Sequence, residues 1–181
     1  MAGEGVIFSL HIVDISFFLY NGKSCKALIE VISELSFLIN SSRLTADKLN
    51  STSIPVILCS FPNRVTRLIK SGQYTPLNLN IRLSEELVKY PVEQRTQRAN
   101  DEVMSIVSQC KSPTILEDYE ILFDPRYNID AIKVFIEIAR HQKVIVKWCG
   151  RLNGDSLEYA TLDDKDYHSF RIQDYDITCV I

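Results

Sequence analysis

The sequence predicts an α/β domain in which helices flank a mostly parallel β-sheet. Two observations lead to this fold class. Short apolar runs that suit buried parallel strands alternate along the chain with segments whose apolar residues recur at helical spacing. One of these runs, at 114–116, ends in the acids Glu117 and Asp118, as expected of a strand that delivers carboxylates to the ligand-binding edge of a sheet.

The expected strands are apolar runs that are mostly rich in β-branched and aromatic residues. Pro55 stands near the start of its run, where a strand tolerates a proline. The two runs between 156 and 172 resemble a hairpin. In chain order, the runs cover residues 6–13, 15–20, 54–59, 77–80, 114–116, 143–148, 156–160, 167–172 and 177–181.

Apolar stripes at helical spacing predict the helices. Asn128 is expected to cap the last of them, and Asp130 suits the positive end of its dipole. The helices cover residues 24–39, a short segment around 67–70, 81–110 with an interruption at Pro91, and 129–141, while 41–53 predicts a loop or a short helix. From residue 54 onward, this alternation predicts a P-loop NTPase-like sheet, with the 54–59 and 114–116 strands near each other in its middle.

Length and composition indicate one globular domain. The 181 residues can bury a core of their own, so a single α/β domain over 1–181 is expected, with an extra strand and helix in 1–50 and the P-loop-like core in 54–181. Hydrophobic residues make up 46% and charged residues 24%, which argues against a disordered chain. The net charge of −3 gives the whole protein no polyanion-binding signature.

The cysteines and the apolar start indicate a cytoplasmic protein. The five cysteines are widely spaced, without a metal-ligand pattern, and are expected to be reduced thiols. The apolar segment at 6–20 contains His11 and Asp14, lacks a basic flank and is too short to span a bilayer. No membrane role is expected.

Two places resemble a phosphate-binding loop in part. Gly22, Lys23 and Ser24 supply the end of a Walker A motif, but Phe17 stands where the motif needs its first glycine. A plain strand-to-helix turn is the favoured interpretation there.

The second place, 60–66, follows the 54–59 strand but contains neither a glycine nor a lysine. Its candidate ligand-binding residues are Asn63, Arg64 and Thr66: Arg64 offers a charge to phosphate, and Thr66 a hydroxyl to Mg²⁺. As a phosphate loop, this segment looks disabled.

The acids after the 114–116 strand are the candidate catalytic residues. In P-loop hydrolases one such carboxylate holds Mg²⁺ and another orients the attacking water, which are the roles considered for Glu117 and Glu120. Glu117 and Thr66 are accordingly the candidate metal ligands. The alternative is a strand that runs into a polar turn of solvated acids.

Charge is distributed unevenly along the chain. Residues 64–98 carry seven Lys/Arg and three Asp/Glu, a net of +4, whereas residues 155–176 carry seven Asp/Glu and two Lys/Arg, a net of −5. Arg95 and Arg98 lie three apart on one expected helical face. They are candidate phosphate or nucleic-acid contacts, with an ordinary solvated face as the more frequent outcome.

Several motifs resemble, in the same order, the BrxF family of small P-loop proteins from bacteriophage exclusion (BREX) defence systems. They are Leu77 to Ser84, Glu93 to Arg95, Glu117 to Pro125, Arg140 to Lys143 leading into Val146 to Trp148, Leu157 to Ala160, and Asp166-Tyr167. The resemblance covers residues 54–181 and leaves the first fifty residues outside.

The resemblance implies a P-loop ATPase-like domain that works beside the other BREX proteins, with ATP and Mg²⁺ as the candidate cofactors. The chain departs from the family pattern at two places, the 63–66 segment and Glu117, and agrees with it at Glu120. The chain has Asn63 to Thr66 where the family has Gly-Lys-Thr, so that Val65 takes the lysine position. Glu117 replaces the family's Mg²⁺-binding Asp, while Glu120 matches a following acid. Losing the lysine removes the charge that contacts the β- and γ-phosphates.

Three functions are therefore considered. The leading one is a nucleotide-responsive or catalytically degenerate subunit that acts through BREX protein partners. The second is an active ATPase that draws its lysine from Lys23. The third is a DNA-contacting module that uses the basic 64–98 stretch. Two further alternatives are considered: that the domain binds no cofactor, and that the protein forms a homo-oligomer.

Overall fold

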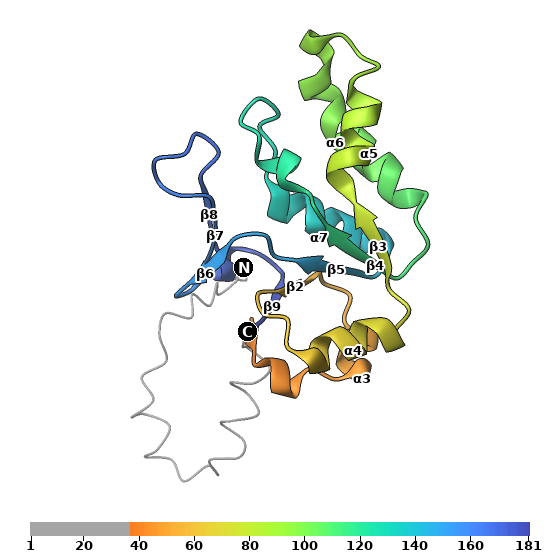
Figure 1. The fold of residues 1–181 in the computed structure, drawn as a ribbon, viewed down its shortest axis with the longest axis vertical. Helices are drawn as coiled ribbons and strands as arrows, with labels where there is room; N and C mark the ends of the chain where they lie inside the picture. The colour runs from red at the N-terminus through yellow and green to blue at the C-terminus, as the bar shows by residue number, and fades with distance from the viewer. Residues whose placement is uncertain (1–36) are drawn as a thin grey trace, which may run out of the picture. The chain divides into compact units, whose positions relative to one another are not determined.

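The computed structural model describes residues 37–181, which form one compact unit (Figure 1). The strands expected at 6–13 and 15–20, the turn at Lys23 and most of the helix expected at 24–39 lie outside the described residues. At the end of that helix the expectation is wrong, because Leu38–Ile39 is a strand, β1.

A parallel sheet forms the centre of the unit, which confirms the predicted fold class. Its strand order is β1-β9-β2-β5-β4-β3, and every neighbouring pair is parallel. Strand β5 therefore separates β2 from β4, the strands expected near each other. The strands are β1 (Leu38–Ile39), β2 (Val56–Leu58), β3 (Thr75–Asn78), β4 (Thr114–Glu117), β5 (Val144–Lys147) and β9 (Thr178–Val180).

Helices cover both faces of this sheet (Figure 1). Strand residues alternate between the faces, so Val56 and Leu58 belong to the smaller cluster with α4, whereas Ile57 joins the larger cluster with α5, α6 and α7. The α-helices are α3 (Ala46–Ser51), α4 (Asn63–Ser71), α5 (Leu79–Leu87), α6 (Val92–Ser108) and α7 (Ala131–His141). Short 3₁₀ turns are η1 (Ser41–Arg43), η2 (Glu120–Phe123) and η3 (Ile172–Asp174).

A small antiparallel sheet follows β5. It contains β6 (Arg151–Asn153), β7 (Ser156–Tyr159) and β8 (His168–Arg171), in that order. The expected hairpin between 156 and 172 is confirmed, and β6 is an additional strand. Leu157 and Phe170 from this sheet are buried in the larger core cluster.

Two expected boundaries are wrong for local reasons. The run at 77–80 does not continue as a strand, because the Asn78 side chain accepts a hydrogen bond from the Ile81 amide and starts α5. Helix α7 is capped by Asp130, whose side chain accepts from the Lys133 amide, rather than by Asn128. Asn128 instead takes a positive φ of 51° in the preceding turn.

Candidate functional site

The carboxyl ends of β2, β5 and β4 lie side by side and define the candidate site. Leu58 of β2 is in register with Lys147 of β5, and Leu116 of β4 is in register with Val146. Glu117 therefore emerges beside Lys147 at the same edge. This is the edge at which parallel α/β sheets bind ligands.

Lys147 stands between the predicted acid and the segment that follows β2. Its Nζ lies 3.7 Å from Oε1 of Glu117 and 5.4 Å from the centre of the Phe61 ring. The first distance indicates an ion pair rather than a hydrogen bond, and the second is within the range of a cation–π contact. We call Phe61, Glu117 and Lys147 the edge cluster.

The segment at the phosphate-loop position is short. Strand β2 ends at Leu58 and α4 already begins at Asn63, after the N-cap Pro62, which makes no side-chain capping hydrogen bond. Thr66 and Asn63 are both exposed in the first turns of α4. Val65, which takes the lysine position, is completely buried in the core between α4 and the sheet.

Two further groups around this segment have structural partners. The Arg64 guanidinium donates to the Ser41 carbonyl oxygen at 2.7 Å, and the Cys59 amide donates to the Val180 carbonyl oxygen at 2.8 Å. A Walker A cradle needs free inward-facing amides and a lysine. The residues present do not fit that cradle.

Glu120 is held by a neighbouring amide. Asn80 donates from Nδ2 to Oε2 of Glu120 at 2.6 Å and accepts from the Ile121 amide at 2.9 Å. Asn78 donates to the Asp118 carboxylate at 2.6 Å, and Asp118 adopts a positive φ of 48°. The acidic turn after β4 is therefore tied to the start of α5, and Glu120 acts there as a structural acceptor.

Tyr119 fixes the end of β5 from within the core. Its hydroxyl donates to the Lys147 carbonyl oxygen at 3.0 Å and accepts from the Cys149 amide at 3.2 Å. Because the side chain is buried, the pKa of the phenol is raised far above its usual value. This neutral hydroxyl holds the backbone from which the Lys147 side chain projects.

Arg95 and Arg98 meet away from this edge, around Tyr90. Arg95 donates from Nε to the Tyr90 carbonyl oxygen at 3.0 Å, and the Arg98 guanidinium carbon lies 5.5 Å from the centre of the Tyr90 ring. Both residues thus contribute to the turn between α5 and α6. They are not brought together with the edge cluster by any contact among residues 37–181.

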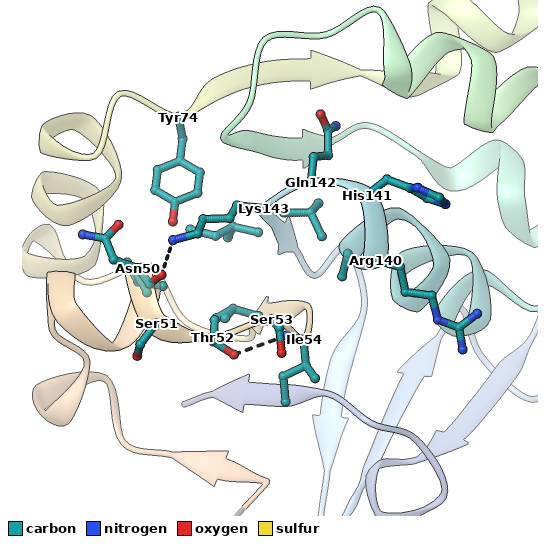
Figure 2. Close-up of a pocket in the computed structure, with 15 residues that line it drawn as sticks. Asn50, Ser51, Thr52, Ser53, Ile54, Tyr74, Arg140, His141, Gln142 and Lys143 are labelled. Atoms are coloured by element: carbon teal, nitrogen blue, oxygen red, sulfur yellow. Dashed lines mark hydrogen bonds between the residues drawn. The ribbon is translucent and has the colours of Figure 1, made fainter.

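A pocket of about 340 Å³ lies at the opposite edge of the sheet (Figure 2). Its lining comes from the segments that precede β2, β3 and β5, including Tyr74 and residues 140–143. Lys143 points across it and donates to the Asn50 carbonyl oxygen (Figure 2). Because parallel α/β sheets bind their ligands at the carboxyl edge, we place the candidate site at the edge cluster rather than in this pocket.

Sequence reasoning missed Lys147, Phe61 and Asn80. Lys147 is a charged residue near the end of the strand predicted at 143–148, a signal similar to the one that identified Glu117. Its proximity to Glu117 follows only from the order of the strands, which the sequence pattern does not contain. Asn80 was assigned to a strand, which concealed its contact with Glu120.

Comparison of the chain with protein-family models, with curated proteins and with solved structures gave no match. The resemblance to BrxF therefore stays a prediction that depends on the motifs quoted for it. Within residues 37–181, no group of three or more His, Cys, Asp or Glu side chains is arranged to hold a metal ion. In the same range, no helix has the length and apolar character needed to cross a membrane.

Proposed function

We propose that this protein is a catalytically degenerate, P-loop-like subunit that acts through protein partners in a cytoplasmic phage-defence complex. The observation that carries the proposal is the burial of Val65. In a working phosphate loop, a lysine at this position would reach the phosphates. Val65 instead packs against the sheet in the core. Hydrolysis of ATP at an ordinary rate is not expected.

The strand order supports the P-loop-like part of the proposal. When β2, β3, β4, β5 and β9 are numbered one to five in chain order, they lie in the order five-one-four-three-two. P-loop ATPases with one strand inserted between the phosphate-loop strand and the acid-bearing strand have this order. In this chain, β5 takes the inserted place between β2 and β4.

The phage-defence setting is supported by the resemblance of residues 54–181 to the BrxF family. It implies that the partners are the other proteins of a BREX system. Co-expression with these proteins, followed by size-exclusion chromatography, measures whether a complex forms. Failure of every BREX protein to co-elute with the chain would contradict this part of the proposal.

Steady-state ATP hydrolysis by the purified protein tests the degenerate part. We expect no turnover above the protein-free background, and the same result for Glu117→Gln. If the protein hydrolyses ATP at a rate of about 1 s⁻¹ or more, within the ordinary range of enzymes, and Glu117→Gln abolishes it, the protein is an active ATPase and the proposal is wrong.

A further inference from the structure

The edge cluster offers a lysine where the phosphate-loop segment has none. The lysine position of that segment holds the buried Val65, and the Arg64 guanidinium donates to the Ser41 carbonyl oxygen. Lys147 ends the strand between β2 and β4, and its Nζ lies within contact distance of Phe61. Phe61 itself lies two residues before the first residue of α4.

Lys147 and Glu117 both keep binding capacity in this arrangement. Among the described residues, neither side chain has a hydrogen-bond partner, and their 3.7 Å separation is too long for a hydrogen bond between them. The Lys147 side chain is 49% exposed and that of Glu117 36% exposed, so a ligand can reach both. An ammonium has three donors to offer, and none of those of Lys147 is used in a hydrogen bond within residues 37–181.

The chemistry of the surrounding groups indicates an anion with an attached divalent cation. A lysine ammonium is a point charge that suits phosphate oxygens, and one carboxylate beside ligand phosphates and water is a common binding mode for Mg²⁺. The nine-residue helix α4 starts close by and its N-cap, Pro62, gives its first amides no side-chain partner. The Ser60 hydroxyl oxygen is also shielded from solvent and has no hydrogen-bond partner among residues 37–181.

We propose that Lys147 is the phosphate-binding cation of this protein and that the ligand is the polyphosphate chain of a magnesium-bound nucleotide. Glu117 then carries the Mg²⁺ through ligand oxygens and water. The choice of a nucleotide rests on the P-loop-like assignment above. The contact itself rests on the edge cluster.

Binding of MgATP measured by isothermal titration calorimetry tests the proposal. The variants are Lys147→Gln, the charge-preserving Lys147→Arg and the control Lys70→Gln, which removes an exposed lysine from the far end of α4. Loss of a charge-assisted hydrogen bond weakens binding by roughly tenfold to a hundredfold, which is the loss expected for Lys147→Gln. Lys70→Gln is expected to keep the wild-type affinity, and Lys147→Arg, which keeps the charge but changes its geometry, is expected to lose less affinity than Lys147→Gln.

A second ligand gives a readout that a purely structural lysine would not change. With tripolyphosphate in the absence of Mg²⁺, Glu117 competes with the ligand for Lys147. Glu117→Gln is therefore expected to bind tripolyphosphate more tightly than the wild type, whereas Lys147→Gln binds it more weakly. Opposite shifts from two neighbouring substitutions support the proposal even if one variant is less stable.

Equal affinities of the wild type and Lys147→Gln overturn the proposal, as does the absence of any MgATP binding at millimolar concentration. A selective loss with Lys143→Gln would assign the nucleotide to the pocket in Figure 2 and would also overturn it. These outcomes leave the degenerate subunit in place, since they concern binding. Conversely, rapid ATP hydrolysis would contradict the degenerate subunit without affecting the role of Lys147.

Discussion

At the scale of single residues, the acidic turn after β4 depends on the orientation of one amide. Asn80 donates to Glu120 and accepts from the Ile121 amide, so its two ends have opposite partners. A carboxylate at position 80 would keep the second partner but oppose the first. A carboxylate at position 80 would therefore face the Glu120 carboxylate, and Glu120→Gln should remove the repulsion.

We expect Asn80→Asp to lower the free energy of unfolding by about 1–3 kcal/mol at neutral pH, because two carboxylates then face each other. Adding Glu120→Gln restores a donor opposite the new acceptor and should recover most of the loss. Urea unfolding of the two single variants and the double variant gives the coupling energy. A double variant no more stable than Asn80→Asp would show that the contact with Glu120 contributes nothing.

Tyr119 gives a second residue-scale prediction. Tyr119→Phe leaves the Lys147 carbonyl and the Cys149 amide without their partner and should cost about 1–3 kcal/mol of unfolding free energy at neutral pH. Burial raises the pKa of this phenol in the folded state, so the unfolded chain ionises first as the pH rises. The stability that Tyr119 contributes is thus complete below about pH 10 and is lost above it.

The difference in unfolding free energy between wild type and Tyr119→Phe should therefore shrink as the pH is raised above about 10. Denaturant titrations at a series of pH values measure this difference directly, and the other tyrosines cancel from it. A difference that does not change with pH would mean that burial does not raise the pKa of the Tyr119 phenol.

At the scale of elements, α4 and the strand before it form a packed unit in place of a flexible phosphate loop. Val65→Lys should lower the free energy of unfolding by roughly 3–5 kcal/mol, the cost of an uncompensated buried charge, and should not improve MgATP binding. The apolar control Val65→Ile, which adds one methylene to the packed core, should cost about 1–3 kcal/mol. If Val65→Lys were as stable as the wild type and bound MgATP more tightly, the segment would be a working phosphate loop.

Gly150, in the turn between β5 and β6, has no room for a side chain. A Cβ at Gly150 would lie 1.9 Å from the Glu158 carbonyl oxygen, whereas a Cβ at Gly154 meets nothing within 4 Å, although its φ is +59°. Gly150→Ala should therefore lower the free energy of unfolding by about 3 kcal/mol. Gly154→Ala, which only adds backbone strain, should lose about 1 kcal/mol. Thermal unfolding of both variants tests this order, and a larger loss at Gly154 would contradict it.

At the scale of the whole molecule, the sequence predicted the fold class but not the arrangement that creates the site. Apolar runs such as 54–59 and 143–148 identify buried strands, and Pro91 separates two helices, because these signals are local. The position of β5 between β2 and β4 is a long-range property, so the proximity of Lys147 to Glu117 could not be predicted. The start of α5 was missed because the 77–80 run also alternates like a strand.

The origin of the phosphate-binding lysine is also a question for the whole molecule. The sequence offered Lys23, which lies outside the described residues, and the structure offers Lys147. A fragment of residues 37–181 retains every strand of both sheets and both core clusters, so we expect it to unfold cooperatively. We also expect it to bind MgATP with the affinity of the full chain, because the edge cluster is complete within it.

Circular dichroism melting of the fragment establishes that it is folded. Calorimetric titration then compares the MgATP affinities of the fragment, the full chain and the full-length Lys23→Gln variant. If Lys147 contacts the phosphates, all three bind alike, and Lys147→Gln weakens the fragment as it weakens the whole protein. If the folded fragment and Lys23→Gln both lose binding, the cation comes from residue 23. In that case, Lys147 only neutralises Glu117 at the sheet edge.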